Sequence, residues 1–428
     1  MEIIRHGDFD RYWQRQADKG EDAGVSEAVQ AILEAVKTGG DVALRALCQR
    51  FDTVPAQWIF PAAQLEEAWR SLHTTDAELA AALQEAADHI ARFADQQKAQ
   101  CADFDYEMAP GLWTGQRVRA VEKAAIYAPA GRFPLISSVL MGVIPAVRAG
   151  VSEVFVLSPP LKNGRPHPHI MAAAFCAGAH FLCALGGAQA LAAAAFGTET
   201  IPRADLIAGP GNKYVACAKR LLFGQVGIDF VAGPTDLLII ADDKAPVQIT
   251  AADMAAQAEH DPDARARALV ESGEYAAKLA LELQQQALAF PSAQASLDAG
   301  GLIIVYDTPD SACRIANTIA PEHLALHLRD AEQWVPALHN YGSLFIGTAA
   351  AQALGDYSAG INHTLPTGGT ARFTGGLSVR HFLKTTTTLR CAQGSGFDSA
   401  CKAAALIAQK EGLTAHAASV RLRRETEV

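Results

Sequence analysis

The sequence predicts an α/β protein with two Rossmann-like, doubly wound domains and helical extensions at the N- and C-termini. The chain has 428 residues, which corresponds to roughly two to four domains at about 100–200 residues each. Short apolar runs alternate with helical segments from about residue 124 to residue 346, a pattern typical of parallel sheets. The stretches before and after this region show helical periodicity.

We expect the N-terminal part to be helical. Residues 1–22 form a short amphipathic arm in this interpretation. The next helix has Ser26 as its N-cap and ends at Gly39-Gly40, because Ser favours N-caps and Gly ends helices. Further helices are predicted over residues 41–50 and 76–97.

Two sets of strands and helices follow in order along the chain. In the first set, strands are predicted over 124–127, 153–157, 181–184 and 206–208, with helices over 135–149, 170–177, 188–196 and 213–222. In the second, strands are predicted over 237–241, 264–269, 302–305, 324–327 and 344–346, with helices over 247–258, 275–289 and 311–319. From Val379 we expect helices again, including 400–409 and 416–424.

Composition excludes several classes of protein. Lys plus Arg total 36 and Asp plus Glu 46, a net charge of −10, which argues against a nucleic-acid partner. The most apolar stretch, residues 170–197, is interrupted by polar and glycine residues, so no membrane span is expected. The charged N-terminus does not resemble a signal peptide. Eight cysteines without a CxxC pair predict buried thiols in a reducing cytoplasm.

Three glycine-containing turns predict a ligand site at the carboxyl edge of the first predicted sheet. Gly209-Pro-Gly-Asn212 lies between a strand and a helix, where backbone N–H groups suit an anion. Gly186-Gly-Ala-Gln189 follows another strand, and Tyr127-Ala-Pro-Ala-Gly131 a third. Open α/β sheets bind ligands at such an edge. Each turn alone could equally be a simple connection, and the GxGxxG fingerprint is absent.

Polar motifs in the second half predict a catalytic site with nitrogen and oxygen ligands. Gln257 and His260 share a helix face, as two metal ligands would, although a helix-terminal His can also bind the last carbonyls. Glu322-His323 forms an acid/base candidate, or else two ordinary loop residues. A glycine-rich loop carries Asp356 and His363, and Glu411 and His416 lie near the C-terminus.

In combination, these motifs resemble the histidinol dehydrogenase family over nearly the whole chain. The segments that carry the resemblance are Leu185-Gly-Gly-Ala-Gln-Ala-Leu-Ala, Gly197-Thr-Glu-Thr-Ile-Pro-Arg, Gly209-Pro-Gly-Asn, Ala218-Lys-Arg-Leu, Gly224-Gln-Val-Gly-Ile-Asp, Ala232-Gly-Pro-Thr-Asp, Gln257-Ala-Glu-His, Pro321-Glu-His-Leu, Gly355-Asp-Tyr, Asn362-His-Thr-Leu-Pro-Thr-Gly-Gly and Leu413-Thr-Ala-His. Many segments in a fixed order make a specific match.

The resemblance implies a zinc- and NAD-dependent homodimer that oxidises L-histidinol through the aldehyde to L-histidine with two NAD. The implied zinc ligands are Gln257, His260, Asp356 and His416, and the acid/base pair is Glu322 and His323. The implied NAD contacts are Tyr127, Gln189 and Asn212. The substrate would meet Thr235, His363 and Glu411, together with the zinc ligands and His323. Glu411 and His416 would come from the partner subunit.

The resemblance also implies a division into domains and an order of chemical steps. Residues 23–126 with 236–376 would form the first α/β domain, which carries the metal and the catalytic residues. Residues 127–235 would form the NAD-binding domain, and residues 377–428 a helical segment that docks on the partner. His323 has a pKa suited to deprotonate the alcohol, while Glu322 would activate water for the aldehyde step. Zinc would act as template and Lewis acid.

Three departures from the family pattern concern the substrate. The chain has Thr235-Asp236 where the family usually has Ser-Glu, Tyr127-Ala-Pro-Ala-Gly where it has Tyr-Val-Pro-Gly-Gly, and Asp261 where it has Gly. Arg132-Phe-Pro-Leu and Phe373-Thr-Gly-Gly-Leu resemble a sister branch that oxidises a sulfonated propanediol, 2,3-dihydroxypropane-1-sulfonate. That alcohol is the alternative substrate. A non-catalytic paralogue would need a damaged site, and a metal hydrolase would not need the glycine turns.

Overall fold

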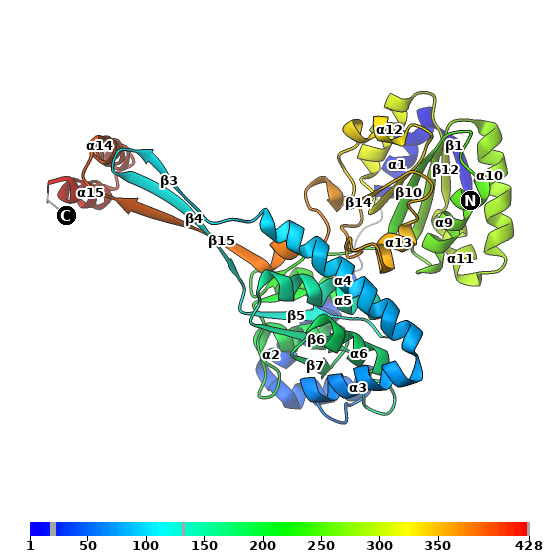
Figure 1. Ribbon diagram of the computed structural model, residues 1–428, viewed down its shortest axis with the longest axis horizontal. Coiled ribbons are helices and arrows are strands. Elements are labelled where there is room, and N and C mark those ends of the chain that lie inside the picture. The colour runs from blue at the N-terminus through cyan, green and yellow to red at the C-terminus, as the bar shows by residue number, and fades with distance from the viewer. Residues whose placement is uncertain (18–22, 131–132, 426–428) are drawn as a thin grey trace.

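The computed structural model describes residues 1–17, 23–130 and 133–425. Figure 1 shows two α/β domains and a long, thin arm that extends from one of them. Two six-stranded sheets form the centres of the domains, and a three-stranded sheet forms the arm. The α/β class is therefore confirmed.

Sheet A lies in the domain that contains the N-terminus, and its strand order is β1-β12-β11-β10-β13-β14. All of its pairs are parallel. The strands are β1 (Glu2–Arg5), β10 (Asp236–Ala241), β11 (Arg265–Val270), β12 (Leu302–Val305), β13 (His323–His327) and β14 (Ser343–Ile346). Alternate residues of each strand face opposite sides, so Leu237 and Ile239 pack into one core and Leu238 and Ile240 into the other.

Helices cover both faces of sheet A. One core contains residues of α9 (Val247–Glu259), α10 (Gly273–Ala287) and α11 (Pro291–Gly300). The opposite core contains residues of α1 (Phe9–Ala17) and α12 (Pro309–Ile319). The short helix α13 (Gln352–Tyr357) follows β14. Single turns of 3₁₀ helix are η1 (His6–Asp8), η2 (Ala331–Gln333), η3 (Val335–Ala337), η4 (Thr370–Arg372) and η5 (Val379–Phe382).

Sheet B has the order β2-β7-β6-β5-β8-β9. Its strands are β2 (Ile59–Pro61), β5 (Lys123–Tyr127), β6 (Glu153–Ser158), β7 (Phe181–Ala184), β8 (Leu206–Ala208) and β9 (Gly227–Ile228). Only the edge strand β2 runs antiparallel to its neighbour. One face is covered by α2 (Ala23–Phe51), α7 (Gly187–Phe196) and α8 (Lys213–Leu222). The other is covered by α3 (Ala62–Thr75), α4 (Ala77–Ala99), α5 (Ile136–Ala149) and α6 (Pro168–Ala177).

The expected assignment of residues 23–126 to the domain of residues 236–376 is wrong. Val29 and Leu33 of α2 pack into one core of sheet B, and Leu83 and Ile90 of α4 pack into the other. Helical periodicity shows that a helix buries one face, but it does not show which sheet receives that face. The first residues of the chain join sheet A instead, where β1 pairs with β12.

The expected pair of helices after residue 26 is one kinked helix. Helix α2 runs through Ser26, so Ser26 is not its N-cap, and Gly40 interrupts it with φ 50° and ψ −136°. A β-carbon on Gly40 would lie 2.4 Å from Glu199 Oε2, and Glu199 accepts a hydrogen bond from Asp41 N at 2.8 Å. Glycine is needed here because its backbone tolerates this conformation and leaves room for Glu199.

The C-terminal segment is only partly helical, which corrects the expectation for residues 377–428. Strand β15 (Leu383–Cys391) pairs antiparallel with β4 (Leu112–Ala120), which pairs with β3 (Phe104–Ala109). The threonine-rich run 385–388 favours a strand because β-branched residues suit a pleated sheet. Helices α14 (Ser395–Lys410) and α15 (Thr414–Glu425) lie at the tip of the arm.

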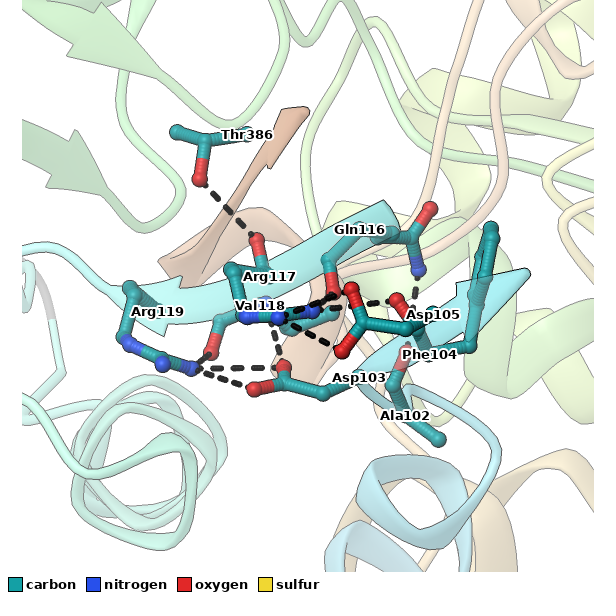
Figure 2. Close-up of polar contacts among 9 residues, drawn as sticks. All are labelled: Ala102, Asp103, Phe104, Asp105, Gln116, Arg117, Val118, Arg119 and Thr386. Atoms are coloured by element: carbon teal, nitrogen blue, oxygen red, sulfur yellow. Dashed lines mark hydrogen bonds and ion pairs between the residues drawn. The ribbon is translucent and has the colours of Figure 1, made fainter. Parts of the chain in front are cut away.

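Ion pairs join β4 to the start of β3 at the base of the arm. Figure 2 shows Arg117 on Asp105 and Arg119 on Asp103, with closest N···O distances of 2.8 and 2.9 Å. On the other side of β4, Thr386 Oγ1 donates to the carbonyl oxygen of Arg117 at 3.3 Å. These contacts join both neighbouring strands to β4.

The burial of the cysteine thiols and the length of the apolar helices bear on two further expectations. All eight cysteines are free. Five are buried, and Cys101 and Cys176 are half-buried, but Cys391 is exposed, so the expectation of buried thiols is wrong for Cys391. Among the helices that the structure describes, none has the length and apolar character needed to cross a membrane.

Candidate active site

The Glu322-His323 pair lies at the amino-terminal edge of sheet A. His323 is the first residue of β13, and its register partner on β10 is Leu237. Thr235 and Asp236, at the start of β10, are therefore immediate neighbours of the pair. Two short polar segments far apart in sequence meet here because the two parallel strands begin at the same edge.

Glu322 is held by a buried hydrogen-bond network. Its side chain is only 6% exposed, and its Oε2 accepts from Thr235 Oγ1 at 2.5 Å and from Asp236 N at 3.0 Å. Asp236 Oδ1 in turn accepts from Glu322 N at 2.8 Å, while Asp236 Oδ2 pairs with Arg267 at 3.2 Å. Burial raises the pKa of Glu322 to about 7, against the opposing effects of His323 and the Thr235 hydroxyl.

His323 lies between two carboxylates. Its Nδ1 is 3.7 Å from Glu322 Oε2, and its Nε2 is 3.4 Å from Asp356 Oδ1. Burial alone would lower the pKa of His323, but the two carboxylates outweigh burial and raise the pKa to about 9. The geometry leaves Nε2 buried without a well-formed hydrogen bond, so this nitrogen is available to a substrate or another ligand.

Oxygen and nitrogen donors from two helices meet beside His323. Gln257 is buried in the last turn of α9, His260 is its exposed C-cap, and Asp356 is buried in α13. Gln352 Nε2 lies 2.6 Å from Gln257 Oε1 and 3.5 Å from Asp356 Oδ2. Burial acts to raise the pKa of Asp356, but the neighbouring histidines, with His323 first, lower it. The arrangement therefore gathers anionic and neutral oxygens around a point that favours positive charge.

His363 joins this site to the domain of sheet B. Its Nδ1 lies 2.8 Å from the carbonyl oxygen of Asp356, and its Nε2 lies 3.3 Å from Ser138 Oγ, at the start of α5. Asn362 beside it donates to the carbonyl oxygen of Met141 at 2.7 Å. Burial lowers the pKa of His363. The glycine-rich loop thus bridges the amino edge of sheet A and the helix that follows β5.

The predicted nucleotide residues gather at the carboxyl edge of sheet B. Tyr127 ends β5, and its hydroxyl accepts a hydrogen bond from Gly187 N, after β7, at 3.1 Å. Gln189 is buried in the first turn of α7. Asn212 caps α8, accepting from Tyr214 N and Val215 N at 3.0 and 3.2 Å. The chain order reverses between β5 and β8, the position where doubly wound sheets bind nucleotides.

A buried ion pair that the sequence did not reveal fixes the loop after β8. Lys219 Nζ lies 2.6 Å from Asp229 Oδ1 and donates to the carbonyl oxygen of Gly209 at 2.5 Å. Asp229 Oδ2 accepts from Gly209 N at 2.8 Å. Gly209 has φ 115°, and a β-carbon there would lie 2.2 Å from the Tyr127 carbonyl oxygen. Both backbone groups of Gly209 are therefore anchored.

Glu411 and His416 lie apart from the other predicted site residues within one chain. Both are exposed near the tip of the arm, at the end of α14 and in α15. Consistent with this separation, no group of three or more His, Cys, Asp or Glu side chains in the described part of the chain is arranged to hold a metal ion.

Sequence reasoning missed Gln352 and Ser138. Gln352 lies four residues before Asp356 on one helix, a spacing that places both side chains on the same face and could have indicated it. Ser138 carries no comparable signal, because its contact with His363 joins residues 225 positions apart.

Glycine turns at the carboxyl edge of a Rossmann-like sheet, joined to a buried acid/base pair, are typical of dehydrogenases. Comparison with known proteins shows which dehydrogenase family the chain resembles. The family model for histidinol dehydrogenase matches residues 14–424. A curated histidinol dehydrogenase of Thermus thermophilus is 44% identical over 410 residues, covering 94% of this chain and 95% of the relative. One of Parasynechococcus marenigrum is 40% identical over 413 residues, covering 96% and 93%.

A solved structure agrees with the sequence relatives. The crystal structure of histidinol dehydrogenase from Elizabethkingia anophelis matches with a TM-score of 0.88 and 32% identity, covering 95% of this chain and 93% of that one. The chain belongs to the histidinol dehydrogenase family, a family of oxidoreductases.

Proposed function

We propose that this protein oxidises L-histidinol to L-histidine, the last steps of histidine biosynthesis, with two molecules of NAD. The observation that carries the proposal is the buried Glu322–His323 pair at the junction of the two domains, linked by Thr235 to Gln257. The names of the relatives support the substrate. NAD, when bound, would accept one hydride in each of the two oxidation steps.

His323 and Glu322 are assigned to different half-reactions. His323, in its neutral form, would take the proton of the alcohol hydroxyl at Nε2, which lacks a well-formed hydrogen bond. Because the two carboxylates raise the pKa of His323 to about 9, this neutral form increases as the pH rises toward 9. Glu322, whose pKa burial raises to about 7, would take a proton from the water that attacks the aldehyde. Because the two side chains are 3.7 Å apart, they titrate as a coupled pair.

The donor set fits a zinc ion. Gln257 Oε1 and Asp356 Oδ2 both face the amide nitrogen of Gln352, so they are arranged to receive positive charge, and His260 lies in the next helical turn. Zinc usually takes four ligands, and in the proposal His416 of a second copy is the fourth. When bound, zinc would act as a Lewis acid and orient the substrate. The neutral oxygen of Gln257 would leave this site less anionic.

The arm supports the proposal of a homodimer with shared sites. Leu406 and Ile407 of α14 are each 58% exposed, and Leu413 is 46% exposed. Apolar side chains exposed together in this way are typical of an interface. In the proposed dimer the arm would bring Glu411 to the substrate and His416 to the metal of the partner subunit.

The remaining contacts complete the proposed active unit. Tyr127, Gln189 and Asn212 would hold NAD at the carboxyl edge of sheet B, while Thr235 and His363 would contact the substrate.

The net charge of −10 argues against a nucleic-acid partner, and we propose a cytoplasmic location.

The second candidate substrate is a small sulfonated alcohol such as 2,3-dihydroxypropane-1-sulfonate. Thr235-Asp236 departs from the usual family pattern, and the segment at Phe373, which is 80% exposed, resembles the sister branch; both favour this substrate. Arg132 of the other such segment lies outside the described residues.

An absorbance assay of NADH formation tests the two substrates side by side. We expect zinc-loaded protein to form two NADH per L-histidinol consumed and to act poorly on the sulfonate. Faster turnover of the sulfonate would reverse the choice. Turnover of neither alcohol would contradict the proposed chemistry.

A further inference from the structure

Asp52 places an unused carboxylate oxygen at the carboxyl edge of sheet B. It follows the last residue of α2, and its backbone N–H still bonds to the carbonyl oxygen of Cys48 at 2.9 Å. Its Oδ2 lies 2.9 Å from the position that a β-carbon on Gly186 would occupy. The half-buried carboxylate therefore lies directly against the glycine turn that opens α7.

The carboxylate of Asp52 has capacity for another hydrogen bond. Oδ1 accepts from Thr53 N at 2.8 Å, whereas no donor in the described part of the chain reaches Oδ2. The arginines near the end of α2 are engaged elsewhere: Arg45 lies over the Trp58 ring and Arg50 over the Phe51 ring. A half-buried carboxylate without a cation favours a ligand that brings hydroxyl donors.

The strand order indicates which part of a dinucleotide reaches Asp52. The Gly186 turn follows β7 and the Gly209 turn follows β8, with β6 and β5 between them. Three strand spacings of about 4.8 Å separate the turns by about 14 Å. The reacting groups lie near the end of β5, where Ser138, at the start of the following helix α5, contacts His363. A dinucleotide with its nicotinamide there extends its adenosine half toward β7 and Asp52.

We propose that Asp52 receives the 2′- and 3′-hydroxyls of the adenosine ribose and thereby sets a preference for NAD over NADP. The inference rests on the proposed use of a nicotinamide dinucleotide. A carboxylate accepts hydrogen bonds from both hydroxyls of a ribose. In NADP a phosphate replaces the 2′-hydroxyl donor and brings negative charge against Asp52, so attraction becomes repulsion.

Nucleotide binding to the Asp52→Asn variant tests the proposal without requiring turnover. Asn keeps the shape of the side chain and the acceptor for Thr53 N. We expect the Kd for NADH, measured by its fluorescence, to rise about tenfold or more, because hydrogen bonds to charged groups contribute about 1.5–3 kcal/mol. The ratio of the Kd for NADPH to that for NADH should fall by at least the same factor.

The matched control is Glu153→Gln, which removes one carboxylate from the opposite, amino-terminal edge of the same sheet, where Glu153 pairs with Lys123 at 2.9 Å. It should leave both Kd values unchanged. A second test uses an NADH analogue that lacks the adenosine 2′-hydroxyl. The wild type should bind this analogue more weakly than it binds NADH. The Asp52→Asn substitution should raise the Kd of the analogue by a smaller factor than it raises the Kd of NADH.

Three results would contradict the proposal. Equal affinity of the wild type for NADH and NADPH would remove the preference while leaving the proposed reaction intact. Unchanged binding in Asp52→Asn would remove the residue from the site. Failure of the wild type to bind either nucleotide would overturn the proposed function together with this inference.

Discussion

The two sheets present opposite edges to the candidate active site. Sheet B contributes the carboxyl ends of β5, β7 and β8, as doubly wound folds usually do. Sheet A contributes the amino-terminal ends of β10 and β13, where Thr235 and His323 lie. Two domains of the same architecture therefore serve different chemistry through different edges.

The carboxyl edge of sheet A is filled by its own side chains. Asp242, just after β10, accepts hydrogen bonds from Arg329 N and Lys244 N, each at 2.8 Å. Nearby, the buried His327 ring lies 2.9 Å from Thr250 Oγ1. At the corresponding edge of sheet B, Gly186 and Gly209 follow the strands and have no side chain. The side chains that follow the strands therefore decide whether the edge at a switch point can receive a ligand.

The largest effect is expected from His260→Asn, at the amino-terminal side of sheet A. We expect bound zinc and activity to be lost together, and activity to fall by at least about a hundredfold. The reason is that no neighbouring side chain can take the place of His260 as a zinc ligand. Elemental analysis and the NADH assay measure the two quantities. Asp243→Asn at the carboxyl side of the same sheet is the control and should keep both. Full activity in a metal-free preparation would refute the zinc site.

Subunit exchange tests whether the amino edge of sheet A is completed by a second copy. Mixing His260→Asn protein with His416→Asn protein should restore part of the lost activity, because a mixed dimer holds one intact and one doubly damaged site. Each variant alone is expected to be inactive. Exchange shown by mass spectrometry without any recovered activity would mean that the arm serves its own subunit.

Glu322→Gln should separate the two half-reactions at this edge. We expect aldehyde oxidation to fall about 10²–10³-fold, and alcohol oxidation to fall less. In the wild type, burial raises the pKa of Glu322 to about 7, so the basic form is lost as the pH falls through 7. The rate of aldehyde oxidation should then drop about tenfold per pH unit, and this decline should disappear in the variant. Equal losses in both steps would show that the pair acts as one unit.

A smaller effect, at the carboxyl edge of sheet B, is expected from Lys219→Met. It leaves the buried Asp229 carboxylate unpaired, which should cost about 3–5 kcal/mol of unfolding free energy and weaken NADH binding. The double variant Lys219→Met/Asp229→Leu should regain stability in urea unfolding but not NADH affinity, because Gly209 has lost its anchors. If both recovered, the ion pair would serve stability alone.

Much of the architecture follows from local patterns in the sequence. Runs such as 237–241 and 153–157 are short, apolar and bounded by polar turns, so they predict buried parallel strands, and the structure confirms them as β10 and β6. The arm was missed because β3 and β15 are largely exposed and β4 is mostly half-buried, so these strands lack the apolar alternation that reveals a buried face. The domain of α2 to α4 was missed because periodicity does not identify the packing partner.

For the candidate site, local sequence patterns identify which side chains are present and which turns carry them. The pair Glu322-His323, the helix spacing of Gln257 and His260, and the glycine turns at 186 and 209 are all local features. The folded structure is needed to show that Glu322 meets Thr235 where β10 and β13 begin, and that Gln352 joins Gln257 to Asp356. It also shows that His416 lies on the arm, apart from these residues. The physical reason is that burial and proximity depend on contacts between residues distant in sequence. No local sequence pattern predicts the pKa of the buried Glu322 carboxylate or how far the arm extends from its domain.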